Sequence, residues 1–183
     1  MPRPRKLEEP DTDTPGDLCS RCGMCCNGTL YNYVTLRSQE EVDALLKYDP
    51  AIPIITRSEQ PTFDEPCRLH DGTGCTAYRD RPDTCSRYTC ELLRAVDRDE
   101  VTDVEARLII EEARALVENV REYVELEPGR PLAVSTWLSL PGSATPEARQ
   151  AWERALLHLR RHFLGPDPDA PKVDAAAAIA TGD

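Results

Sequence analysis

The sequence predicts a mainly α-helical protein with irregular loops, in which a small cysteine-rich module packs on two or three helices. All eight cysteines fall between Cys19 and Cys90, and none follows. The second half of the chain carries apolar residues at the three- and four-residue steps of amphipathic helices. The stretch from Phe63 to Thr84 is interrupted by prolines and glycines, which favour turns and loops over regular structure.

The cysteine-rich half has too few large apolar residues to form a core that holds it together. The whole chain has only two Phe, two Trp and two Met, and a small module with so little core usually needs a staple. No apolar segment follows the basic residues at the N-terminus, so no secretory signal is expected. A cytoplasmic location follows, in which thiols stay reduced. Eight reduced thiols then predict a metal-stapled module.

The net charge excludes two classes of partner. With 22 Lys and Arg against 33 Asp and Glu, the formal charge is −11. Nucleic acids and anionic membranes both require concentrated positive charge, so neither is expected. No apolar run reaches the roughly 18 residues of a membrane span. Metal ions are therefore the expected partners, a protein partner is considered beside them, and the oligomeric state is left open.

Composition divides the chain into four expected segments. Two are disordered tails, rich in charged residues and proline or in alanine. Between them lie the cysteine module and a helical region that braces it. The segments are an N-terminal tail at 1–17, the cysteine-cluster module at 18–95, the helical bracing region at 96–165 and a C-terminal tail at 166–183.

The first long helix is expected at about 102–127. Thr102 and Glu105 form a capping box at its start, and Pro128-Gly129 ends it. Its apolar face is expected to consist of Val104, Leu108, Ile109, Leu116, Val117, Val120 and Val124.

A second helix begins with Thr145 as cap and Pro146 in the first turn, and Gly165 stops it. Its apolar stripe is Ala148, Trp152, Ala155, Leu156, Leu159 and Phe163. An extended or buried connection is expected at 132–140.

Shorter elements are expected in the cysteine-rich half. Ser38 and Glu41 form a capping box for a helix at about 38–48. Segments 29–36 and 52–56 are rich in β-branched residues and could form strands.

The first cysteine group, Cys19, Cys22, Cys25 and Cys26, has the spacing C-x-x-C-x-x-C-C. Two-residue gaps let successive thiolates wrap one ion, and they also resemble the binding run of an iron–sulfur cluster. The run has no fourth cysteine followed by proline, so it is not the bacterial ferredoxin pattern. Because adjacent side chains diverge, one of Cys25 and Cys26 is expected to reach a second ion, bridge two ions or stay free.

The second group is Cys67, Cys75, Cys85 and Cys90. Its spacing is too open for a simple zinc knuckle, but it supplies four ligands that complete one or two sites with the first group. A helix expected from 84 to 96 would put Cys85 and Cys90 near its N-terminus, where the helix dipole stabilises thiolates.

Three arginines lie among these cysteines. Guanidinium groups of Arg79, Arg81 and Arg87 would offset the negative charge of a thiolate site and donate hydrogen bonds to sulfur. Tyr78 is expected to pack against the site.

The two groups together resemble a known family. After C-x-x-C-x-x-C-C come Cys67, Gly74-Cys75, Tyr78, Arg81-Pro82, Cys85, Tyr88 and Cys90. This order is similar to that of the zinc- or iron-chelating CxxCxxCC proteins, also called YkgJ-like. The resemblance implies metal chelation through cysteine, with zinc and iron both proposed, and implies no defined reaction.

The sequence therefore predicts a cytoplasmic protein that chelates zinc or iron, or holds an iron–sulfur cluster, through its eight thiolates. Its expected role is to handle the metal or cluster, or to present the bound centre to a partner. One alternative is an iron- or iron–sulfur-dependent redox or modification enzyme. Another is a thiol redox switch. Whether the protein is an enzyme stays open, and no catalytic residue is assigned.

Overall fold

The computed structural model describes residues 15–72, 74–123 and 145–165. The mainly α class with irregular loops is confirmed. The helices are α1 (Pro15–Cys22), α2 (Gln39–Leu46), α3 (Asp83–Ser86), α4 (Glu91–Asp97), α5 (Asp103–Tyr123) and α7 (Pro146–Leu159), with short turns η1 (Tyr78–Asp80) and η2 (Arg160–Leu164). The strands are β1 (Tyr33–Thr35), β2 (Ile55–Arg57) and β3 (Gln60–Asp64). The connection expected at 132–140 and the tail at 166–183 lie outside the described residues, as does most of the tail at 1–17.

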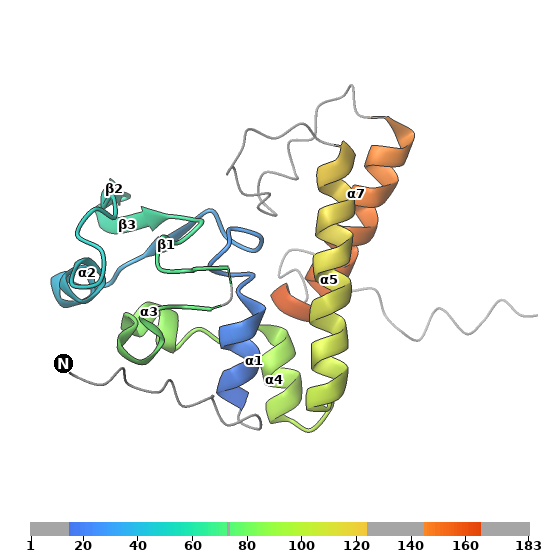
Figure 1. The fold of residues 1–183 in the computed structure, drawn as a ribbon, viewed down its shortest axis with the longest axis horizontal. Coiled ribbons are helices and arrows are strands. Elements are labelled where there is room, and N and C mark those ends of the chain that lie inside the picture. The colour runs from blue at the N-terminus through green and yellow to red at the C-terminus, as the bar shows by residue number, and fades with distance from the viewer. Residues whose placement is uncertain (1–14, 73, 124–144, 166–183) are drawn as a thin grey trace, which may run out of the picture.

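The elements form two lobes (Figure 1). The helical lobe consists of α1, α4, α5 and α7, and the sheet lobe of the three strands with α2 and α3. Each lobe has its own cluster of buried apolar side chains. No helix in the described residues has both the length and the apolar character needed to cross a membrane.

In the helical lobe, α5 and α7 begin with the side-chain caps that the sequence predicts. The Thr102 backbone N–H donates to the Glu105 carboxylate at 2.8 Å, and the Glu105 N–H donates to the Thr102 hydroxyl at 3.3 Å. The Thr145 hydroxyl accepts the Ala148 N–H at 3.2 Å. These bonds occupy amides that a first helical turn leaves free, so both predicted starts are confirmed.

The buried face of α5 differs from the prediction. Val104 and Leu108 were expected in the core but are 69% and 59% exposed. The contact face is instead built around alanines, whose small side chains let neighbouring helices approach closely. Its buried residues are Ala106, Ile110, Ala113, Val117 and Val120.

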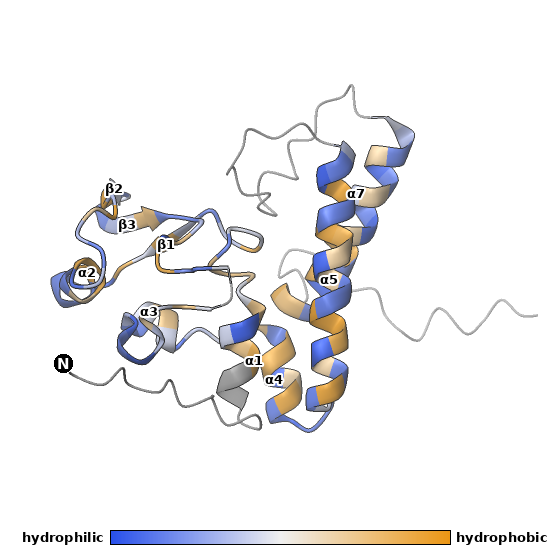
Figure 2. Ribbon diagram, in the orientation of Figure 1, coloured by the Kyte–Doolittle hydropathy of each residue, from blue (hydrophilic) through white to orange (hydrophobic). Residues whose placement is uncertain are grey.

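On α7 the predicted stripe is confirmed, and both helices are amphipathic (Figure 2). Trp152 is partly buried against the same core. After η2 the chain turns at Gly165, whose φ of +77° suits glycine. The fully buried stripe residues are Ala148, Ala155, Leu156, Leu159 and Phe163.

The sheet lobe contains one strand that the sequence analysis missed. β1 lies within the strand expected at 29–36, and β2 overlaps the one expected at 52–56. β3 was not expected, and its last two residues fall where turn and loop were predicted. It pairs antiparallel with both other strands, in the order β1-β3-β2. Thr62 and Phe63 of β3 are fully buried. The strand is short and contains Pro61, a residue that argues against a strand in sequence-based prediction.

One buried carboxylate joins α2 to α3. Ser38 caps α2 as predicted, accepting the Glu41 N–H at 3.4 Å. The Glu41 carboxylate accepts the Arg37 N–H at 2.6 Å and the Thr84 N–H at 2.7 Å. This carboxylate therefore holds α3, the helix that carries Cys85, in place.

The single helix expected at 84–96 is wrong. The segment forms two short helices, α3 and α4, and the chain leaves helical geometry between them. Cys85 lies within α3, whereas Cys90 is the N-cap residue of α4. The intervening residues, which include Tyr88 and Thr89, have modest helix propensity, and Tyr88 makes a tertiary contact instead.

Candidate metal centre

The eight cysteines lie along the boundary between the two lobes. All are free thiols of intermediate exposure, and none forms a disulfide. Three pack against the core of the helical lobe, and three others against the core of the sheet lobe. The first three are Cys22, Cys25 and Cys90, and the second three are Cys67, Cys75 and Cys85.

The first cysteine group sits on the end of α1 and the turn that follows it. Gly23 makes this turn with a φ of +64°, a conformation that glycine adopts without strain. The Arg114 guanidinium of α5 donates to the Cys22 carbonyl at 3.1 Å. The Cys67 N–H donates to the Cys26 carbonyl at 2.8 Å. These two hydrogen bonds to backbone carbonyls connect the first group to both lobes.

Set A combines three cysteines of the first group with the last of the second: Cys19, Cys22, Cys25 and Cys90. Burial raises the pKa of Cys22 to about 11, and the charges of Cys90 and Cys19 add to the rise. Burial also raises the pKa of Cys25 well above its usual range, and the charges of Cys26, Cys22, Cys19 and Cys90 add to the rise. These four thiols are neighbours, because all of them line one small cavity.

Set B combines the remaining four: Cys26, Cys67, Cys75 and Cys85. Burial raises the pKa of Cys26, and Glu65 and the other three thiols of the set raise it further. Burial likewise raises the pKa of Cys85 to about 12, with Cys67, Glu65 and Cys75 contributing. The two sets are in contact: the charge of Cys26 is the largest charge contribution to the raised pKa of Cys25, and the charge of Cys75 adds to the raised pKa of Cys19.

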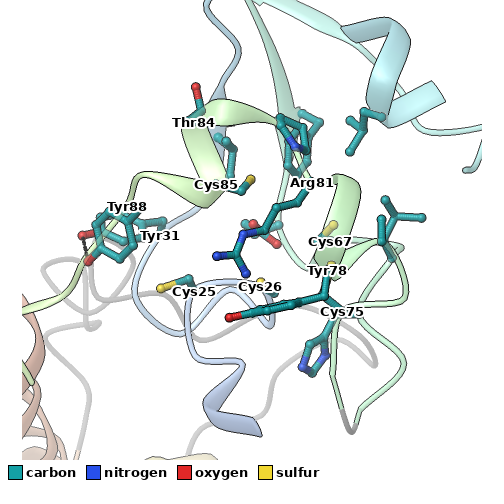
Figure 3. A pocket seen from close by; sticks show the side chains of 18 of the residues that line it. Cys25, Cys26, Tyr31, Cys67, Cys75, Tyr78, Arg81, Thr84, Cys85 and Tyr88 are labelled. Atoms are coloured by element: carbon teal, nitrogen blue, oxygen red, sulfur yellow. Dashed lines mark hydrogen bonds between the residues drawn. The ribbon is translucent and has the colours of Figure 1, made fainter. Parts of the chain in front are cut away.

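The two sets border adjoining cavities. Set A lines a cavity of about 40 Å³, together with Cys26 of set B and apolar side chains such as Met24 and Phe163. Set B lines a cavity of about 370 Å³, which Cys19 and Cys25 also reach. Figure 3 shows five of these thiols around the larger cavity, with Arg81 extending over the Tyr78 ring.

The thiols are gathered but do not converge on a point. In the described parts of the chain, no three side chains among His, Cys, Asp and Glu stand so that they could hold a metal ion. The donor chemistry nevertheless fits, because buried thiols without disulfides are ligands that zinc and iron both accept. Metal binding at these sets would therefore require the side chains to move inward.

Of the side chains expected to surround the ligands, two lie at the cavity. The Arg81 guanidinium carbon is 3.9 Å from the centre of the Tyr78 ring, and both residues line the larger cavity. Burial raises the pKa of Cys19, and the Arg81 charge opposes that rise. Arg79 and Arg87 are exposed and line neither thiol cavity, and Arg87 pairs with Asp83 at 3.0 Å.

Three further features border the site. Glu65 is only 6% exposed and lines the larger cavity. The hydroxyls of Tyr31 and Tyr88 are 2.7 Å apart, with the rings edge to face. His70 also lines the larger cavity. A glutamate two residues before Cys67 carries no recognisable signal, because its burial depends on tertiary packing.

Substituting Gly23→Ala should destabilise the metal-loaded protein by about 2 kcal/mol, because alanine is strained at positive φ and the added group needs space. A Cβ at this position would lie 2.3 Å from the His70 Nε2, so the ring must move away. Urea unfolding measures the effect.

Two controls separate these contributions. Gly72→Ala carries the conformational cost alone, because its φ is +93° and no atom lies within 4 Å of the new Cβ. Combining Gly23→Ala with His70→Ala removes the clash and should restore part of the stability. Equal stabilities of Gly23→Ala and the wild type would show that this loop adapts freely.

Comparison with known proteins gives one match. The family model described as "CxxCxxCC: Putative zinc- or iron-chelating domain" matches residues 18–111. The matched range begins in α1, contains all eight cysteines and ends within α5. No curated protein and no solved structure matches the chain.

Proposed function

The chain belongs to the family of zinc- or iron-chelating CxxCxxCC domains, and from that premise we propose that it binds two metal ions, one in each set of four thiols. The protein handles these ions or presents one of them to a partner. The observation that carries this proposal is the arrangement of eight free thiols around two adjoining cavities at the lobe boundary.

The cavities favour two single ions over one polynuclear centre. The set A cavity of about 40 Å³ is close to the roughly 30 Å³ that one water molecule occupies in the liquid. A cavity of this size suits one ion better than a cluster of several metal and sulfide atoms.

The surroundings of the two sets suggest different roles. Set A packs largely against the core of the helical lobe, so its ion would join α1, the turn after it and the start of α4, and act structurally. Set B borders the larger cavity, so its ion is the one that can be exchanged or presented. Four thiolates around one divalent ion carry a charge of about −2, which Arg81 would offset in part.

We also propose a cytoplasmic location. Thiols stay reduced there and remain available as ligands. All eight cysteines are free, in keeping with such an environment.

Proton release tests the proposed function. Because burial raises the pKa of Cys22 and Cys67 to about 11, these thiols are protonated at pH 7 in the metal-free protein. Each ion must displace them, so about four protons should be released per ion bound. Affinity should consequently rise steeply from pH 6 to pH 8.

The measurement is a zinc titration of the reduced protein against a coloured chelator, with proton release followed in weak buffer. About two equivalents and about four protons per ion are expected. Metal binding with fewer than about two protons per ion would contradict four protonated thiol ligands. Loss of all binding after mild peroxide, with recovery in reductant, would instead support the redox switch.

A further inference from the structure

We propose that Glu65 is an additional metal ligand of set B, supplying one carboxylate oxygen beside the thiolates. The inference rests on the proposed function, because it requires an ion in set B. It assigns a ligand that neither the cysteine pattern nor the family description contains.

The position of Glu65 carries the argument. The residue follows β3 directly and comes two residues before Cys67, so the chain delivers the carboxylate and a thiol to the same wall of the cavity. It lines the same cavity as all four members of set B, namely Cys26, Cys67, Cys75 and Cys85. The carboxylate therefore lies among the sulfurs that would hold the ion.

The Glu65 carboxylate is also incompletely satisfied. The side chain is 94% buried, given its exposure of 6%, and its Oε2 has no hydrogen-bond partner among the described residues. Buried polar atoms without partners are rare in folded proteins and call for an explanation. A cation bound beside this oxygen would supply the missing interaction.

A second buried carboxylate shows the contrast. Glu41 is 7% exposed, and its two oxygens accept bonds from Arg37 and Thr84. Both carboxylate oxygens of Glu41 therefore have hydrogen-bond partners, whereas Oε2 of Glu65 has none among the described residues. Burial in this protein does not by itself leave a carboxylate unpaired.

The consequence is a chemical difference between the two sets. The described residues that line the set A cavity include no Asp or Glu, so set A has only thiolates to offer. A carboxylate in set B could hold the ion while one thiolate leaves, which opens a coordination position. Set B would then be the exchangeable site facing the larger cavity, and set A the closed one.

X-ray absorption of the zinc-loaded full chain tests the assignment. Oxygen ligands lie at about 2.0–2.2 Å from zinc and sulfur at about 2.3 Å, so the two shells can be distinguished. The wild type should show sulfur with a minor oxygen shell, and Glu65→Gln should lose that shell. Asp64→Asn, at the neighbouring exposed carboxylate paired with Arg57, is the matched control and should retain it.

Each outcome decides the proposal. A sulfur-only shell in the wild type, or an oxygen shell that persists in Glu65→Gln, overturns it, the latter because water or another residue would be the ligand. If Glu65→Gln loads one ion less while its circular dichroism spectrum is unchanged, the assignment is supported. If Glu65→Gln fails to fold, Glu65→Asp takes its place, because the shorter side chain withdraws the carboxylate and should also lose the oxygen shell. Failure of the proposed function would be distinct, because the wild type would then bind no zinc.

Discussion

Removing the metal at pH 7 should unfold the cysteine-rich part of the chain while α5 and α7 keep much of their helix. Structural zinc sites contribute about 10–16 kcal/mol of binding free energy in zinc-finger peptides. Whole domains are stable by only about 5–15 kcal/mol. Among the described residues, the sheet lobe has a small core of seven buried side chains and three short strands. Its core is therefore too small to replace the free energy that the bound ions contribute.

Hydrogen exchange of the chelated protein measures this effect. Amides between Cys22 and Cys90 should lose protection, and those of α5 and α7 should lose less, because the two helices pack on each other through buried residues of their own. Adding zinc back should restore protection and is the control. Unchanged protection in the first half after complete metal removal would contradict the structural role of the metal.

Replacing one thiol in each set should remove one ion at a time. Cys90→Ser should lose the ion of set A, and Cys85→Ser should lose that of set B, because a hydroxyl does not replace a thiolate on zinc or iron. Cys90→Ser should be the more destabilising of the two, because Cys90 packs against the larger core of the helical lobe. Metal analysis and thermal unfolding of each variant measure the two effects.

Ser86→Ala is the matched control for these variants. Ser86 is exposed and adjacent to Cys85, and its hydroxyl bonds only locally, to the Asp83 carbonyl. This variant should keep both ions. If Cys90→Ser and Cys85→Ser each lost all metal, the eight thiols would form one shared centre and the division into two sets would be wrong.

Local rules were sufficient to predict the starts of α2, α5 and α7. The caps at Ser38, Thr102 and Thr145 depend on residues within three positions, and all three form. The buried face of α5 was predicted less well, because large apolar residues were favoured over Ala106 and Ala113. Those alanines matter only once neighbouring helices are in place, and a single sequence does not reveal such neighbours.

At the site, too, the sequence did not reveal which residues become neighbours in the fold. The sequence pattern identified the cysteines and Arg81, and the family match covers all eight thiols. Their grouping could not be predicted, because it depends on Cys90 returning to the first group through the packing of α4 against α1. Glu65 was missed for a related reason, since only the folded cavity distinguishes it from an exposed acidic residue.

The measurement that tests the central claim most directly is the metal and sulfide content of the full chain purified without oxygen. Two separate four-thiolate sites predict about two ions of zinc or iron per chain and no acid-labile sulfide. Four or more irons per chain with matching sulfide, and a brown colour with absorption near 400 nm, would contradict the claim and identify an iron–sulfur protein.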